Sequence, residues 1–222
     1  MQHILEESFS ALRQDSPGFD PQLDDFFEAD EVLQYHVDTP EGQHADAPGV
    51  LIYISPKPGA RLPDAWAEVL NMHNLVWIGA HGSGNEVHVA RRVGLAQLGL
   101  AVAHRFTPTC DEKVYLTGFS GGGRVASMML PAYPQAYAGA IFICGANPMF
   151  TATPETIEAL KNTPMVFLTG TGDFNLEDTQ MAIATYQQAG LTAAQLQIVN
   201  GLGHALPESA DLDTALRHLA KI

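Results

Sequence analysis

Short runs of apolar residues recur along the chain, separated by polar segments rich in glycine and proline. The runs hold many β-branched and aromatic residues, a composition typical of buried strands. Strands are therefore predicted at residues 32–37, 50–54, 75–78, 114–117, 140–143, 165–169 and 195–199.

The segments between these strands carry helical signals. Helices are predicted at residues 64–71, 87–103, 124–130, 176–188 and 211–220, with a short helix within 3–13. Pro131 is expected to end the helix that begins at Arg124, because proline lacks a backbone N–H. Apolar strands that alternate with helices predict an α/β fold, a mostly parallel sheet covered by helices on both faces. In such sheets the chemistry gathers at the carboxyl ends of the strands.

A chain of 222 residues can bury one substantial core, and a single domain over residues 1–222 is expected. Residues 1–30 are acidic and weakly patterned, and are interpreted as an N-terminal extension. About twenty residues separate the strands ending near 144 and beginning at 165, and no larger insertion is apparent elsewhere. No large lid domain is therefore expected.

Composition narrows the classes of partner. The formal net charge is -14, which argues against nucleic acid and anionic membrane surfaces as partners and is consistent with simple solubility. No apolar stretch is long enough to span a membrane, and residues 1–10 lack the features of a signal peptide. A cytoplasmic protein is expected, or an exported one whose signal has been removed. Oligomeric state is left open.

Cys110 and Cys144 are expected to be free thiols, since they offer no disulfide framework.

The pentapeptide Gly118-Phe119-Ser120-Gly121-Gly122 directly follows the strand at 114–117 and precedes a helical stretch. A strand, tight turn and helix form the context in which a G-x-S-x-G serine becomes a nucleophile. The pattern alone occurs by chance in a glycine-rich chain, so it needs partners. A serine hydroxyl requires a base that takes its proton and a third group that orients the base.

Two loops supply candidates for these partners. Among nine histidines, His204 follows a late strand on a short loop and precedes the last helix. Its alternative role is a loop histidine that caps that helix. Asp173 follows the strand at 165–169, and its rivals Glu177 and Asp178 fall in a first helical turn, where a carboxylate already stabilises the helix dipole. The order Ser120, Asp173, His204 is that of the α/β-hydrolase fold.

Two other interpretations fail on the spacing of their residues. Gly170-Thr171-Gly172 begins like a dinucleotide-binding motif, but Asn175 stands where the third glycine should be. His73, His81 and His88 lack the spacing of a metal site. No cofactor and no metal are therefore expected.

Acyl transfer also needs two N–H donors for the developing oxyanion. The backbone of Gly121, directly after the nucleophile, is expected to supply the first. The second should come from the loop after the strand at 50–54, where Pro56 and Pro58 have no N–H, and Ser55 or Lys57 must supply it. Lys57 is favoured.

The stretch 113–123, Lys-Val-Tyr-Leu-Thr-Gly-Phe-Ser-Gly-Gly-Gly, and the later Ile143-Cys144-Gly145-Ala146 carry a family resemblance. The sequence resembles serine esterases of the α/β-hydrolase superfamily. It is most similar to the poly(3-hydroxybutyrate) depolymerase and feruloyl esterase-like branch, over residues 48–220. The resemblance implies a nucleophile at Ser120, an acid at Asp173 and a base at His204. The branch often has His-Gly at the oxyanion loop, where this chain has Ser55-Pro56.

The predicted function is hydrolysis of carboxylic esters through an acyl-enzyme. Small or extended esters are expected to enter an open site, bordered by Phe119, Phe150 and Leu206, each of which could equally be ordinary packing. Two alternatives stay open at this point. One is a serine peptidase or acyltransferase with the same three residues, and the other is a non-catalytic binding protein on the same scaffold.

Overall fold

A computed structural model of the chain describes residues 1–42, 44–150 and 152–220. The fold groups into two compact units, Met1–Val114 and Tyr115–Ile222. The single domain over residues 1–222 stays a prediction.

The first unit holds four strands in the order β1-β2-β4-β3. They are β1 (Gln2–Ser8), β2 (Val32–Asp38), β3 (Gly49–Ile54) and β4 (Leu75–Ala80). β1 pairs with β2 and β2 with β4 antiparallel, whereas β3 and β4 are parallel. The helices of this unit are α1 (Phe9–Gln14), α2 (Ala67–Met72), α3 (Val89–Gln97) and α4 (Gly99–His104), with 3₁₀ turns at Pro21–Phe26 and Asp64–Trp66.

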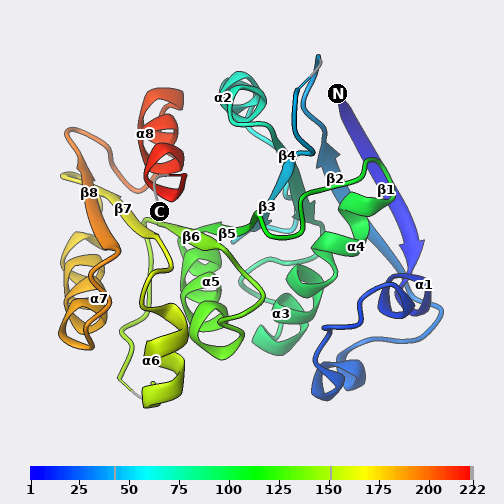
Figure 1. The fold of residues 1–222 in the computed structure, drawn as a ribbon, viewed down its shortest axis with the longest axis horizontal. Coiled ribbons are helices and arrows are strands. Elements are labelled where there is room, and N and C mark those ends of the chain that lie inside the picture. The colour runs from blue at the N-terminus through cyan, green and yellow to red at the C-terminus, as the bar shows by residue number, and fades with distance from the viewer. Residues whose placement is uncertain (43, 151, 221–222) are drawn as a thin grey trace. The chain divides into compact units, whose positions relative to one another are not determined.

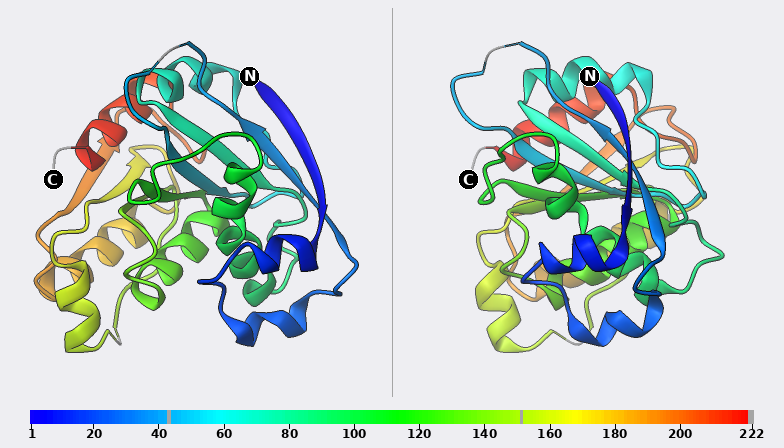
Figure 2. Two further views of the ribbon diagram at one scale, coloured as in Figure 1. Left: turned by 45° about the vertical axis from the view of Figure 1, so that its right-hand side comes forward. Right: turned by 90° about the vertical axis from the view of Figure 1, so that its right-hand side faces the viewer.

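The predicted helix within residues 3–13 is wrong over its first half. Residues 2–8 form β1, which lies along β2 for its whole length before α1 begins (Figure 2). The rings of Phe9 and Phe27 stack with centroids 4.5 Å apart, and Phe19 meets both edge-on. The N-terminal segment therefore contributes to the core of its unit.

The predicted helix at 87–103 is also wrong in one respect, because it divides at Leu98 into α3 and α4. Gly99 begins the second helix where the backbone passes close to Ile52. A Cβ added at Gly99 would lie 3.0 Å from side-chain atoms of Ile52. This close approach to β3 accompanies the division.

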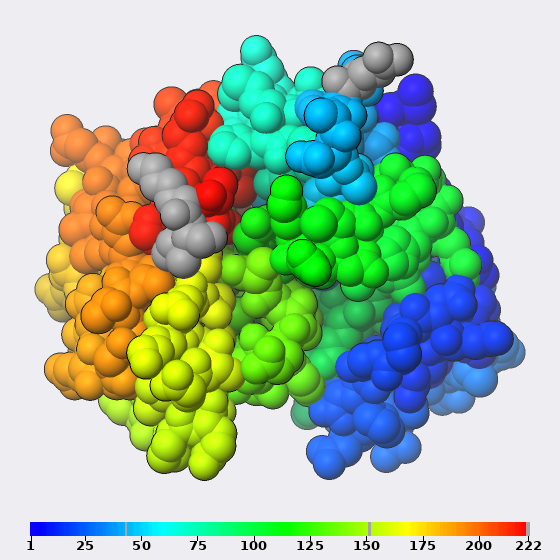
Figure 3. Space-filling model, viewed as in Figure 1, coloured from blue at the N-terminus to red at the C-terminus, as the bar shows by residue number. Residues whose placement is uncertain are grey.

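The second unit holds four parallel strands in the order β5-β6-β7-β8. They are β5 (Val114–Phe119, whose first residue falls in the other unit), β6 (Gly139–Ile143), β7 (Met165–Gly170) and β8 (Ala194–Val199). The helices are α5 (Gly121–Ala132), α6 (Pro154–Leu160), α7 (Leu176–Gln188) and α8 (Ser209–Leu219). α8 covers one face of β6 and β7, and α5 and α7 cover the other (Figure 1). The outer surface of α8 is open to solvent, in red in Figure 3.

Pro131 does not end the helix that precedes it, contrary to the prediction, since α5 continues to Ala132. Proline cannot donate to the carbonyl four residues earlier, which belongs to Ser127. The hydroxyl of the buried Tyr186 on α7 donates to that carbonyl instead, at 2.9 Å. The hydrogen bond lost at Pro131 is thus replaced from a neighbouring helix.

The apolar runs form the buried centre of each unit. Every residue of β6 and β7 is buried, as expected for strands covered on both faces. The predicted α/β fold with mostly parallel strands is confirmed. Cys110 and Cys144 are both free thiols. Within the described residues, no helix is both long and apolar enough to cross a membrane.

Candidate active site

Ser120 lies in the turn between β5 and α5, in an unusual backbone conformation. Its φ is 53°, in the left-handed region that residues other than glycine seldom adopt. Its N–H donates to the carbonyl of Ile143 on β6 at 2.8 Å, which holds the turn against the neighbouring strand. Strain of this kind persists where the surrounding structure enforces it, and it gathers at functional sites.

Three glycines allow the backbones around Ser120 to approach one another. A Cβ at Gly118 would lie 2.4 Å from the backbone of Gly122, and a Cβ at Gly123 would lie 2.3 Å from the carbonyl oxygen of Gly145. A Cβ at Gly145 would lie 2.5 Å from the carbonyl oxygen of Ser120 itself. These three glycines therefore make room for the backbone contacts of the turn.

We expect Gly145→Ala to displace Ser120, because the contact would be with rigid backbone. Overpacking of this kind costs about 1–3 kcal/mol of unfolding free energy. A displacement of the nucleophile by about 1 Å can lower turnover roughly 10²-fold. Thermal unfolding and ester turnover measure the two effects. Gly18→Ala is the matched control, since a Cβ there meets nothing within 4 Å; equal effects of the two substitutions would contradict the assignment.

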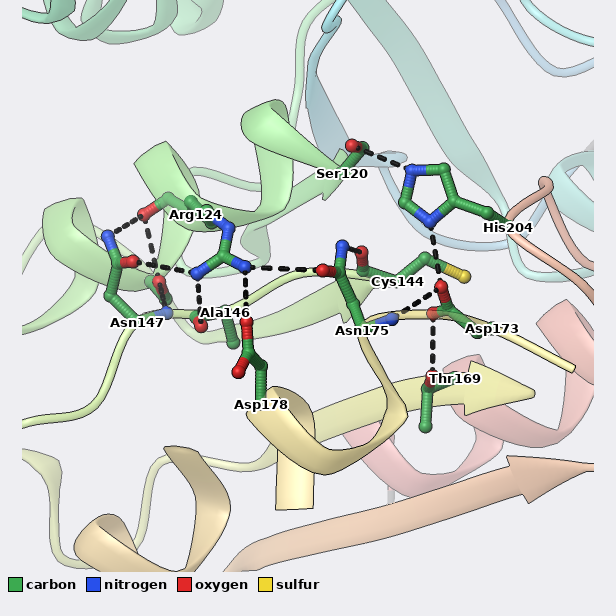
Figure 4. A network of polar contacts seen from close by, with 11 residues as sticks. Ser120, Arg124, Cys144, Ala146, Asn147, Thr169, Asp173, Asn175, Asp178 and His204 are labelled. Atoms are coloured by element: carbon green, nitrogen blue, oxygen red, sulfur yellow. Dashed lines mark hydrogen bonds and ion pairs between the residues drawn. The ribbon is translucent and has the colours of Figure 1, made fainter. Parts of the chain in front are cut away.

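The structure brings Ser120, His204 and Asp173 together in one hydrogen-bonded relay (Figure 4). His204 Nε2 lies 2.9 Å from Ser120 Oγ, and His204 Nδ1 lies 2.8 Å from Asp173 Oδ1. An ionised carboxylate only accepts, so Nδ1 carries the proton, and Nε2 is free to accept from the serine hydroxyl. All three residues belong to the second unit. They follow β5, β7 and β8, at the carboxyl ends of parallel strands.

Asp173 is completely enclosed, and its carboxylate is fully hydrogen-bonded. Its side chain has no exposed surface. Oδ2 accepts from Thr169 Oγ1 at 2.7 Å, and Oδ1 accepts from the N–H of Asn175 at 3.0 Å as well as from His204. Burial on its own raises the pKa of this carboxyl, but the hydrogen bonds from Asn175, Thr169 and His204 outweigh it and lower the pKa below its usual range. Asp173 is therefore ionised at neutral pH.

This lowered pKa predicts a pH-dependent contribution to stability. The ionised carboxylate stabilises the fold at any pH above the pKa of unfolded aspartate, about 3.9, and the contribution is lost as pH falls through the lower folded pKa. Asp173→Asn should therefore lower the free energy of unfolding by about 1.5–3 kcal/mol near pH 6, the usual strength of charged hydrogen bonds. Thermal unfolding from pH 3 to 7 should show this deficit shrinking below about pH 4. A deficit that stays constant down to pH 3 would contradict the prediction.

Cys144 directly follows β6 beside the relay, and its thiol is not activated as a nucleophile. Its Sγ donates to the carbonyl of Ala205 at 3.4 Å. Burial and the neighbouring Asp173 carboxylate raise the pKa of the thiol to about 12, so it stays protonated at neutral pH.

Within the described part of the chain, Cys144, Asp173 and His204 are the group whose ligand atoms lie close enough for a metal, within 4.8 Å of one another. They do not fit that role. The thiol is protonated, and the Asp173 and His204 atoms are already bonded to each other.

A second set of contacts links the helix that follows Ser120 to the residues that follow Asp173 (Figure 4). Arg124, one turn after Ser120, donates to Asn175 Oδ1 at 3.4 Å and to Asp178 Oδ2 at 3.0 Å. Asn175 in turn donates through Nδ2 to the carbonyl of Cys144 at 2.8 Å. Asp178, a rival for the acid in the sequence, pairs with Arg124 and not with His204. Sequence patterns give no sign of these contacts.

The predicted oxyanion donors lie in different units. Gly121 is the first residue of α5, and the N–H groups of a helix's first turn have no partner within the helix. The N–H of Lys57 donates to Ser55 Oγ at 3.0 Å, and that hydroxyl donates to the carbonyl of Gly59 at 2.6 Å. A role for Lys57 would require its N–H to leave Ser55, and this donor stays a prediction.

The predicted pocket residues differ in their surroundings. The Phe119 ring lies 5.0 Å from the His204 ring, and Leu206 is half-buried on the same loop as His204. Phe150 is 75% exposed and lines a groove of about 330 Å³ with Met128, Pro131, Met149 and Tyr186, among others. No relay residue is among the described residues that line this groove.

Phe174 was not predicted from the sequence, and it lies directly against His204. The two ring centroids are 4.0 Å apart, closer than those of Phe119 and His204. Its position immediately after Asp173 is the one signal in the sequence that could have indicated it.

A match to a known protein family establishes to which family the chain belongs. The model of the phospholipase/carboxylesterase family matches residues 102–222, which is more than half of the sequence and includes the whole relay. The chain belongs to the phospholipase/carboxylesterase family. The predicted α/β-hydrolase serine esterase superfamily is thereby confirmed.

This phospholipase/carboxylesterase family member resembles a protein of Arabidopsis thaliana named "Probable carboxylesterase SOBER1-like". The two are 33% identical over 98 residues, which cover 43% of this chain and 37% of the relative. The match thus spans little more than a third of the length of that curated relative.

Solved structures share the fold of this carboxylesterase family member at low sequence identity. A ferulic acid esterase superimposes with a TM-score of 0.68 at 12% identity, over 99% of each chain. The substrate-bound fluorophosphonate-binding serine hydrolase FphF of Staphylococcus aureus gives 0.66 at 11% identity, over 100% of this chain and 99% of that one. An S-formylglutathione hydrolase of Staphylococcus aureus gives 0.64 at 13%, over 99% and 96%. These likenesses confirm the predicted α/β-hydrolase fold.

Proposed function

We propose that this protein hydrolyses carboxylic esters through an acyl-enzyme formed on Ser120. The observation that carries the proposal is the unbroken relay from Ser120 Oγ through His204 to the buried Asp173 carboxylate. The geometry supports it, since the Asp173 carboxylate is ionised at neutral pH and His204 Nε2 faces the Ser120 hydroxyl.

The reaction follows from these contacts. Ser120 Oγ attacks the ester carbonyl carbon as its proton passes to His204 Nε2, which forms a tetrahedral intermediate. The bond to the alcohol oxygen then breaks, and Nε2 returns the proton to that oxygen. Water attacks the acyl-enzyme in the same way, and the acid leaves as Ser120 regains its proton. Asp173 keeps the imidazole in the required tautomer and stabilises its transient positive charge.

The oxyanion of each intermediate is assigned to the N–H of Gly121, at the start of α5. A helix N-terminus favours negative charge, and a preorganised donor of this kind contributes about 2.7–4 kcal/mol to the lowering of the barrier. Lys57 remains the proposed second donor. The relative's name and the family's description, which both refer to carboxylesterases, support an ester substrate.

The proposed substrates are small or extended esters that reach an open site, with Phe119, Phe150 and Leu206 proposed at its border. No nucleic acid or membrane is proposed as a partner, and the cytoplasm is the proposed location. No cofactor is needed for the reaction, because the relay supplies both the nucleophile and the proton transfers.

A fluorophosphonate probe tests the proposal directly. We expect stoichiometric labelling of Ser120, located by peptide mass spectrometry, together with hydrolysis of a short-chain p-nitrophenyl ester that the probe abolishes. A peptidase or acyltransferase would be labelled as well, but it would prefer a peptide or an alcohol acceptor in competition with the ester. Absence of labelling and of turnover would identify a binding protein and refute the proposal.

A further inference from the structure

Phe174 has an unusual combination of exposure and order. The side chain is 76% exposed, yet its ring lies against the His204 imidazole, with centroids 4.0 Å apart and the two planes tilted by 30°. Large aromatic side chains usually place most of their surface in the core, as Phe142 and Phe167 do in the same unit. One face of Phe174 therefore remains open beside the proposed base.

The backbone on either side of Phe174 is fixed. The N–H of Asp173 donates to the carbonyl of Gly170 at 3.1 Å, and the N–H of Asn175 donates to Asp173 Oδ1 at 3.0 Å. Asn175 is also bonded to the carbonyl of Cys144 through its side chain. The backbone that carries the ring is thus fixed before any ligand arrives, and the ring already lies against His204; a preorganised contact loses little conformational entropy on binding.

The chemistry of the proposed reaction identifies which part of an ester meets this ring. His204 Nε2 gives its proton to the oxygen of the departing alcohol, so that oxygen must come within hydrogen-bonding distance of Nε2. A ring stacked on the imidazole therefore lies beside the alcohol part of the ester. An aromatic group there can stack on the open face of Phe174, and aromatic pairs gain more than their buried area alone provides.

We propose that Phe174 forms a subsite for the alcohol part of the substrate and selects esters of aromatic alcohols, such as benzyl esters. The proposal rests on the proposed ester hydrolysis by the Ser120 relay. It adds a specificity-determining residue and the class of leaving group that the residue favours.

Benzyl acetate and butyl acetate make the test specific, because both release a primary alcohol from the same acyl group. We expect the wild type to prefer benzyl acetate in kcat/KM. Phe174→Leu, which keeps an apolar side chain but removes the ring, should lower that preference about three- to tenfold, mainly through KM for the benzyl ester. Phe174→Tyr, which keeps an aromatic ring, should retain the preference for benzyl acetate.

Two controls separate the subsite from other roles. Methyl phenylacetate carries a ring on its acyl side, and methyl pentanoate carries none. The ratio of their kcat/KM values should be unchanged in Phe174→Leu. Phe26→Leu removes the ring from another Phe–His pair, with centroids 4.9 Å apart, that includes no relay residue, and it should leave both ratios unchanged.

The outcomes distinguish this inference from the function on which it rests. If Phe174→Leu slows all four esters and fluorophosphonate labelling equally, Phe174 merely supports His204 and the subsite is wrong. A change in the acyl-side ratio alone would also overturn it, as would an unchanged benzyl preference with normal labelling. Absence of labelling and turnover in the wild type would instead refute ester hydrolysis itself.

Discussion

Replacing Ser120 with alanine is expected to lower kcat for a short-chain ester by about 10⁶-fold while the protein remains folded. The substitution removes the hydroxyl oxygen proposed to form the acyl-enzyme, and the neighbouring Cys144 cannot replace it because its thiol is protonated and buried. Ester turnover and far-ultraviolet circular dichroism measure the two parts of the expectation.

Ser10→Ala is the matched control for this experiment. Ser10 is exposed and lies at the start of α1, and its hydroxyl contacts only Ser8 among the described hydrogen-bond partners. The ester turnover of Ser10→Ala should equal that of the wild type. Substantial ester turnover by Ser120→Ala, beyond that of the uncatalysed reaction, would remove Ser120 from the mechanism.

Asp173→Asn should lower kcat by about 10⁴-fold while preserving the shape of the site. The amide can donate to Nδ1, which would move the imidazole proton to Nε2 and leave no acceptor for the serine hydroxyl. The loss should appear in kcat more than in KM, since Asp173 is enclosed and does not meet the substrate. Steady-state kinetics with a p-nitrophenyl ester measure both constants.

Asp178→Asn provides the comparison, because it makes the same chemical change on a carboxylate of the adjacent helical turn. Asp178 pairs with Arg124 and is largely exposed, so its loss should lower turnover by less than tenfold. If the two variants lost activity equally, the acid would not be assigned to Asp173.

The elements that could be predicted from the sequence are those whose signal is local. Each apolar run became a strand, as at 165–169, where β7 occupies Met165–Gly170. β1 was missed because Gln2–Ser8 is mostly polar, and its strand depends on pairing with β2 some thirty residues away. The helix predicted at 124–130 continues past Pro131 for a similar reason, since Tyr186 supplies the missing donor from another helix.

The residues of the candidate site also fall into those that the sequence could predict and those that it could not. Ser120, Asp173 and His204 could be found because each stands on a loop after a predicted strand, and topology brings such loops together. Phe174 and Arg124 could not, because their significance lies in one stacked ring and one set of side-chain hydrogen bonds. Contacts of this kind depend on side-chain directions that no periodic pattern encodes.

The thiol of Cys144 offers a native vibrational probe of the relay. An S–H group absorbs in an infrared window that other protein groups leave clear, and its frequency reports the strength of its hydrogen bond. Cys110 is the other thiol of the chain, so Cys110→Ser would leave a single band. Because Sγ lies within 4.8 Å of the Asp173 and His204 atoms, that band should shift when acylation removes the Ser120 hydroxyl that donates to His204 Nε2. Formation of the acyl-enzyme could then be followed in an unlabelled protein, with natural substrates and no chromophore.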